Sequence, residues 1–189
     1  MRIIAGKFRS RPLASMPGMD IRPTSDRLRE TLFNVLCAGN RDALAELTFL
    51  DLFAGTGAVG IEALSRGAGS VVFVESSANA VVLIMENIKS LGVSEGYSVL
   101  RSDVTAALRK LGNAGTAADV VFLDPPYAGQ ALYQGTLEAL AQWSGVNSKS
   151  LVIAEHDKRF DPGERVGALQ RYRTLKQGDA ALSFYRKVT

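Results

Sequence analysis

The sequence has few of the residues that form disulfides or bind transition metals. Cys37 is its only cysteine and His156 its only histidine. A disulfide within the chain needs two cysteines, and protein zinc sites are built from several cysteine and histidine ligands. We therefore expect no disulfide and no metal, and a lone cysteine fits a reducing cytoplasm. We assign Cys37 to the core and His156 to a structural role or a substrate contact.

Long apolar runs are also absent. No stretch approaches the ~18 apolar residues of a membrane-spanning helix, and residues 1–5 form too short an apolar run for a signal peptide. We therefore expect a cytoplasmic protein with no membrane attachment. A chain of 189 residues, 47% hydrophobic and 22% charged, is typical of one globular domain with its own core.

The charge is unevenly placed along the chain. The net charge is only +3, but residues 1–30 contain seven basic and three acidic residues, which gives +4 there and −1 over residues 31–189. This asymmetry favours a polyanionic partner that approaches the N-terminal end, with a solvated basic face as the alternative.

From residue 48 onward, apolar strand patterns alternate with helical ones. The strands are expected at 48–53, 70–75, 97–101, 119–123 and 151–154, followed by an antiparallel pair at 169–175 and 181–187. The helices between them are expected at 58–66, 79–91, 104–111 and 131–143. This alternation predicts an α/β fold with a seven-stranded, mostly parallel sheet. Before it, we expect two short strands within residues 2–13 and a helix from about 25 to 37.

Polar residues follow the first three strands, where ligands bind in such sheets. Gly55, Gly57 and Gly60 match G-x-G-x-x-G, a spacing that allows a tight turn close to a ligand and is equally compatible with a dinucleotide site or a plain turn. Glu75, 20 residues after Gly55, is placed to accept from both hydroxyls of a ribose. Asp103 is placed to accept from an adenine amino group. Together these residues favour a bound adenosine.

The fourth strand is followed by Asp-Pro-Pro-Tyr at residues 124–127. The two prolines fix an extended path and lack N–H donors, so that their carbonyls remain as acceptors. Asp124 adds a carboxylate and Tyr127 a flat aromatic face. This combination suits a planar ring that carries an amino group, and a rigid loop with a buried tyrosine is the alternative.

The glycine turn followed by Asp-Pro-Pro-Tyr resembles the class I methyltransferases that modify exocyclic or amide nitrogens. Two N-terminal blocks, IIAGKFRSRPL at 3–13 and RPTSDRLRETLFN at 22–34, resemble the RsmD family of bacterial 16S ribosomal RNA guanine-N2 methyltransferases. The resemblance covers nearly the whole chain. It implies a Rossmann-like methyltransferase domain at 41–189, preceded by a basic, RNA-contacting extension at 1–40.

The resemblance also implies roles for individual residues. S-adenosylmethionine is the implied cofactor, and its expected contacts are Asp51, Phe53, Gly55, Thr56, Gly57, Glu75, Ser76, Asp103, Val104 and Asp124. The expected catalytic groups are Asp124, Pro125 and Tyr127. The expected RNA contacts are Lys7, Arg9, Arg11, Arg22, Thr24, Arg27 and Arg29. The partner is then 16S rRNA, the small ribosomal subunit or an assembly intermediate of it, bound by a monomer.

Three alternatives stay open at this point. An NAD-dependent oxidoreductase shares the glycine spacing but has no use for Asp-Pro-Pro-Tyr. A DNA adenine-N6 methyltransferase shares that motif, although the short connections here leave no room for a target-recognition insert. A non-catalytic RNA-binding assembly factor is the third, and the retention of Glu75, Asp103 and Asp124 argues against it.

Overall fold

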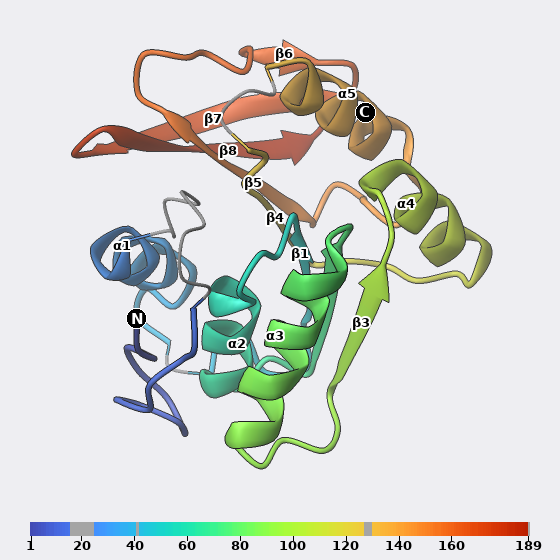
Figure 1. Ribbon diagram of the computed structural model, residues 1–189. Coiled ribbons are helices and arrows are strands. Elements are labelled where there is room, and N and C mark those ends of the chain that lie inside the picture. The colour runs from blue at the N-terminus through green and yellow to red at the C-terminus, as the bar shows by residue number, and fades with distance from the viewer. Residues whose placement is uncertain (16–24, 41, 127–129, 189) are drawn as a thin grey trace.

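The computed structural model describes residues 1–15, 25–40, 42–126 and 130–188 (Figure 1). One eight-stranded sheet, in the order β3-β2-β1-β4-β5-β8-β7-β6, runs through the molecule. Its strands are β1 (Thr48–Leu52), β2 (Ser70–Glu75), β3 (Tyr97–Arg101), β4 (Val120–Leu123), β5 (Leu151–Asp157), β6 (Arg165–Val166), β7 (Leu169–Gln177) and β8 (Ala180–Lys187). Strands β1 to β5 pair in parallel, and β8, β7 and β6 continue the sheet antiparallel.

Helices cover both faces of the sheet (Figure 1). They are α1 (Asp26–Leu36), α2 (Ala58–Ser65), α3 (Ala78–Ser90), α4 (Val104–Asn113) and α5 (Gln130–Gln142). One core cluster joins α1, α2 and α3 to the sheet, and a second joins α4 and α5 to the other face. Strands buried on both faces are continuously apolar, as in the fully buried β4. None of the helices in the described part of the chain is long and apolar enough to cross a membrane.

The predicted α/β fold with a mostly parallel sheet is confirmed, but the strand count of seven is wrong. The additional strand is β6, which has only two residues, Arg165 and Val166. They pair with Gln170 and Leu169 across a tight turn. A strand of that length has no periodicity that a sequence can reveal. The two strands expected within residues 2–13 are also not formed, since only an isolated bridge joins Arg2 to Pro12.

The N-terminal segment forms only part of a hairpin, in which Ile3 N–H donates to the Arg11 carbonyl at 3.0 Å and Leu13 N–H to the Met1 carbonyl at 3.1 Å, and its other backbone groups bind α2. The N–H groups of Ile4 and Ala5 donate to the Glu62 carboxylate at 2.8 and 3.0 Å, and that of Lys7 donates to the Ser65 carbonyl at 2.6 Å. Gly6 has a φ of +84°, and a Cβ there would lie 1.8 Å from the Ser65 carbonyl oxygen. The segment therefore packs directly on α2, and the boundary placed at residue 40 stays a prediction.

Candidate active site

The glycine turn connects the end of β1 to α2. Phe53, Gly55 and Gly57 all have positive φ values, of 60°, 55° and 76°. A Cβ on Gly60 would lie 2.3 Å from the Phe73 ring of β2, so only glycine lets α2 pack this closely on the sheet. The Gly60 N–H donates to Asp51 at 2.8 Å, which fixes the start of the helix.

Glu75, at the end of β2, is tied to the same turn. Its carboxylate accepts from the Gly55 N–H at 2.9 Å and from the Ser77 N–H at 2.8 Å. Each carboxylate oxygen can accept a further hydrogen bond, because a carboxylate has about four lone-pair sites. Glu75 is partly exposed, so these remaining sites are open to a ligand with hydroxyl groups.

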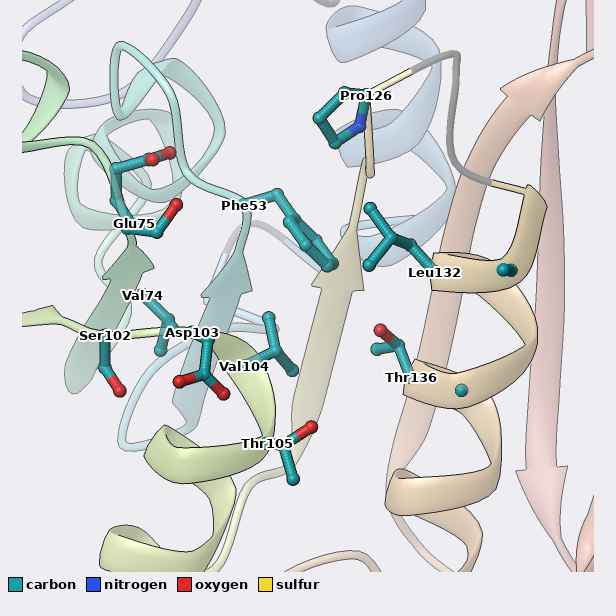
Figure 2. A pocket seen from close by; sticks show the side chains of 13 residues that line it. Phe53, Val74, Glu75, Ser102, Asp103, Val104, Thr105, Pro126, Leu132 and Thr136 are labelled. Atoms are coloured by element: carbon teal, nitrogen blue, oxygen red, sulfur yellow. The ribbon is translucent and has the colours of Figure 1, made fainter.

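A pocket of about 440 Å³ lies beyond the carboxyl ends of β1, β2 and β3 (Figure 2). It is lined by Phe53, Val74, Glu75, Ser76, Ser102, Asp103, Val104, Thr105, Pro126, Ala131, Leu132, Gly135 and Thr136. Figure 2 shows Leu132 and Thr136 pointing from α5 toward Phe53 and Val104. The pocket thus has apolar walls and a few polar groups, as small-molecule sites do.

The pocket brings together half of the predicted cofactor set: Phe53, Glu75, Ser76, Asp103 and Val104. Asp103 also caps α4, since its Oδ1 accepts from the Ala106 N–H at 2.9 Å. The side chain is exposed, and its second oxygen has no partner among the described residues, which leaves it available to a ligand.

The other predicted cofactor residues lie around the pocket without lining it: Asp51, Gly55, Thr56, Gly57 and Asp124. The Thr56 hydroxyl faces the Met1 sulfur, 4.0 Å away, and the Thr56 carbonyl accepts from the Asn87 side-chain amide at 3.1 Å. Asn87 in turn exchanges two hydrogen bonds with the backbone of Ala14, at 2.8 and 3.2 Å. Asn87 therefore links the glycine turn to the N-terminal segment.

Sequence reasoning missed Val74, Ser102 and Thr105 of the pocket and, as a whole wall, the start of α5. Ala131, Leu132, Gly135 and Thr136 lie on one face of this helix and form the wall opposite α4. Their spacing of one, three and four residues can be seen in the sequence and indicates one face of a helix. A helix that packs on a core has the same spacing, so the pattern does not identify a pocket wall. Leu132 is 45% exposed, as expected of a residue that faces a pocket.

Asp124 follows β4 and is partly buried, two residues before Pro126. Burial raises its pKa well above the usual range, and the nearby carboxylates of Glu155 and Asp51 raise it further. Pro125 is buried, and its carbonyl oxygen lies 3.5 Å from the Tyr133 hydroxyl. Pro126 lines the pocket. Tyr127 lies outside the described residues, so its predicted stacking role stays a prediction.

Asp51 is the second acidic residue with an unusual pKa. It is 2% exposed, and burial raises its pKa to about 8, with a smaller increase from the negative charge of Glu75 and an opposing effect from the Gly60 hydrogen bond. His156 is also buried. Its Nε2 lies 2.8 Å from the Ser183 hydroxyl and its Nδ1 lies 2.9 Å from the Asp157 carbonyl, within the sheet, which supports the structural role.

The predicted RNA contacts separate into exposed and buried residues. Lys7, Arg9, Arg11 and Arg27 are exposed. Arg9 and Arg27 line a polar groove of about 420 Å³ between the N-terminal segment and α1, together with Arg2. Arg22 and Thr24 lie outside the described residues.

Arg29 corrects the prediction, because its side chain is fully buried and has no surface to offer RNA. Its Nη2 donates to the Arg2 carbonyl at 2.6 Å and to Asp26 at 2.9 Å, and its Nε lies 3.8 Å from the buried Glu62 carboxylate. The buried Glu62 carboxylate pairs more closely with Arg66, at 2.8 Å, so Arg29 is one of two cations that offset its lost hydration. Arg29 therefore acts inside the protein.

The parallel sheet, its antiparallel end, the glycine turn and the acidic strand ends define the class I methyltransferase fold. The solved structure "Putative methyltransferase yhhF from Escherichia coli" has this fold, with a TM-score of 0.82 and 28% identity over 99% of this chain and 97% of that one. A family model described as Conserved hypothetical protein 95 matches residues 1–186. The chain belongs to this family, and the resemblance to the RsmD family is confirmed.

Two curated relatives support this assignment. The chain is 34% identical to "Putative rRNA methyltransferase YlbH" of Bacillus subtilis (strain 168), over 99% of each chain. It is 33% identical to "Ribosomal RNA small subunit methyltransferase D" of Escherichia coli (strain K12), over 83% of this chain and 75% of that protein.

Proposed function

We propose that this protein transfers a methyl group from S-adenosylmethionine to ribosomal RNA of the small subunit. The finer part of the proposal is the target, the exocyclic N2 of the guanine at position 966 of 16S rRNA. The observation that carries the proposal is the pocket beyond β1, β2 and β3, because Glu75, Asp103 and Pro126 of the Asp-Pro-Pro-Tyr motif all line it. We expect the protein to act in the cytoplasm, where this RNA is found.

The residues of the pocket fit the cofactor. Its volume of about 440 Å³ lies within the range of ~300–1,000 Å³ that is usual for such ligands. The open lone pairs of Glu75 suit the ribose hydroxyls, and Asp103 suits the adenine amino group. Phe53, Val104 and Leu132 supply apolar surface for the purine ring. When bound, S-adenosylmethionine supplies a methyl group activated by a sulfonium.

Asp124 and Pro125 are the groups that receive the substrate amine. The lone pair of guanine N2 is delocalised into the ring, so the amine is a weak nucleophile. Hydrogen bonds from N2–H to the Asp124 carboxylate and the Pro125 carbonyl localise that lone pair and orient it toward the methyl group. Positioning of this kind contributes up to ~7–11 kcal/mol. Tyr127 stacks on the extruded base, which is worth ~1–3 kcal/mol.

The surroundings of Asp124 suit it to accept a proton as well. The methylated amine is cationic and must lose a proton. A carboxylate whose pKa is raised by burial and by Glu155 is a stronger base than an exposed one. Because the ionised form is required, we expect the rate to rise with pH through a range above that of ordinary carboxyl groups, and to level off beyond the raised pKa.

The test is methyl transfer from labelled S-adenosylmethionine to 16S rRNA and to small-subunit particles, with mass mapping of the product. We expect Asp124→Ala to lower turnover by about a hundredfold or more, within the ~10²–10⁴-fold range for loss of a general base. Asp42→Asn removes an exposed carboxylate and is the matched control.

Each contrary result has a definite meaning. Methylation of adenine in DNA, but not of rRNA, would replace this proposal with the DNA methyltransferase alternative. Binding of rRNA with no methyl transfer to either substrate would favour an assembly factor. Full turnover by Asp124→Ala would leave the methyltransferase assignment standing and remove Asp124 from the mechanism.

A further inference from the structure

The C-terminal part of the chain is more basic than the N-terminal part. Residues 158–189 contain eight basic and three acidic residues, a net charge of +5, whereas residues 31–157 carry −6. Strands β7 and β8 together contain five basic residues and no acidic one. The net charge of −1 over residues 31–189 does not reveal the basic C-terminal part, because it is the sum of −6 over residues 31–157 and +5 over residues 158–189.

Internal contacts account for some of these basic side chains. Arg171 pairs with Asp161 at 2.5 Å. The Lys187 amine donates to the carbonyls of Trp143 and Val146 at 3.3 and 3.1 Å. Arg173, in contrast, is exposed and has no ion pair among the described residues.

An irregularity in β7 places an aromatic ring beside Arg173. The register between β7 and β8 shifts between Arg171 and Arg173, so Tyr172 has no partner on β8. Such a bulge turns a side chain away from its regular direction. Tyr172 is 53% exposed, and it is the only aromatic residue among the large apolar side chains exposed in the described part of the chain.

Arg186 and Phe184 hold the Tyr172 ring in place. The Phe184 ring centroid lies 6.3 Å from that of Tyr172, and the Arg186 guanidinium lies 6.0 Å from the same ring. Arg186 is itself anchored, since it donates to the carbonyls of Lys149 and Ser150. The ring is therefore presented to solvent from a fixed support, which limits the entropy lost when a ligand stacks on it.

This surface lies on the face of the sheet that also carries α1. Phe184, which contacts both Tyr172 and the Arg173 guanidinium, belongs to the same core cluster as Leu28 and Phe33 of α1. Figure 1 shows α1 and α5 on opposite sides of the β5–β8–β7 part of the sheet. Arg27 is exposed on α1, which packs on this same face of the sheet.

We propose that Tyr172 and Arg173 form a second RNA contact, in which the tyrosine ring stacks on an unpaired base and the arginine binds a neighbouring phosphate. This inference rests on the proposed function. RNA is the occupant that the surface fits, because single-strand sites combine aromatic stacking with arginine or lysine contacts to phosphate. The acid-free strands around it add no repulsion.

The test measures the Kd for protein-free 16S rRNA by filter binding at several salt concentrations. Stacking is worth ~1–3 kcal/mol and each ~1.4 kcal/mol is tenfold, so we expect Tyr172→Ala to weaken binding about fivefold or more. Tyr172→Phe keeps the ring and should stay within about twofold. Arg173→Gln should lower the slope of log Kd against log salt by about one.

Arg109→Gln is the matched control, because Arg109 is exposed on α4, which packs on the other face of the sheet. Unchanged binding of S-adenosylhomocysteine shows that each variant is folded. Equal binding by Tyr172→Ala and wild type, or an equal effect of Arg109→Gln, would overturn the inference. So would variants that weaken methylation of particles but bind protein-free rRNA normally, since the surface would then contact a protein.

The parallel methylation assay separates the two proposals. If the wild-type protein methylates neither rRNA nor particles, the proposed function fails whatever the variants do. If it methylates rRNA while Tyr172→Ala binds and turns over normally, only the second contact is wrong.

Discussion

The two ends of the chain are both basic, but they use their charge differently. In the N-terminal part, Arg29 is fully buried and its charge offsets that of Glu62, which also binds the backbone of Ile4 and Ala5. In the C-terminal strands, Arg173 remains on the surface beside an exposed tyrosine. The number of charges in a segment therefore does not say where they act, and burial decides which of them can reach a partner.

Between these ends lies an acidic middle with a net charge of −6. Asp51, Glu75, Asp103 and Asp124 all stand at or near the carboxyl ends of its parallel strands, and Glu75 and Asp103 line the pocket. Carboxylates accept hydrogen bonds from hydroxyl and amino groups, whereas arginines bind phosphates. The chain thus separates the groups that would bind the cofactor and the target base from those that would bind the RNA backbone.

The largest expected effect tests the internal use of charge. Arg29→Met removes one of the two cations beside Glu62 and the donor to the Arg2 carbonyl, while Arg66 still pairs with Glu62 at 2.8 Å. We therefore expect a loss of ~1.5–3 kcal/mol in the free energy of unfolding. Urea denaturation followed by circular dichroism measures this. The control is Arg27→Met, which changes an exposed arginine two residues before Arg29. Its free energy of unfolding should stay within ~0.5 kcal/mol of that of the wild type. A loss below ~1 kcal/mol for Arg29→Met would mean that the buried pair contributes little.

The sequence predicted the parallel core of the fold because its physical signature is local. The buried strands β2 and β4 are nearly continuous apolar runs, and an acidic residue ends the first and follows the second. Glu75 and Asp103 were predicted on this basis, and the structure places both at the pocket. Their roles toward a cofactor stay predictions.

The remaining features depend on contacts that no local pattern records. The burial of Arg29 follows from the packing of the N-terminal segment on α2, and its sequence neighbours Arg27 and Glu30 are exposed. The exposure of Tyr172 follows from a register shift between two strands. The pocket wall formed by α5 looks, in the sequence, like an ordinary core-facing helix.

A second prediction concerns the acidic middle. Burial raises the pKa of Asp51 from its ordinary 3.8 to about 8, so between these values the folded protein keeps a proton that the unfolded chain has lost. The stabilisation is fully present below the unfolded pKa and is lost as pH rises toward 8, by up to ~1.4 kcal/mol per pH unit.

Asp51→Asn removes this dependence while its side-chain oxygen can still accept from the Gly60 N–H. We therefore expect the difference in Tm between variant and wild type to move in favour of the variant as pH rises from 5 to 8. Scanning calorimetry at four pH values measures it, and Asp42→Asn, which changes an exposed residue, should leave the slope unchanged. Parallel curves for Asp51→Asn and wild type would show that Asp51 ionises normally.

The smallest expected effect sharpens the comparison of the two ends. The comparison uses the double variant Arg9→Gln with Arg27→Gln, the single variant Arg173→Gln and the triple variant. If both ends contact the same RNA at once, the loss of binding free energy in the triple variant should equal the sum of the other two losses within about 0.5 kcal/mol, because the sites share no partner. The salt slope should fall by about two for the N-terminal pair, one for Arg173→Gln and three for all together. A combined variant that binds no more weakly than the N-terminal pair alone would mean that only the N-terminal end touches the RNA, and that the charge on β7 serves another purpose.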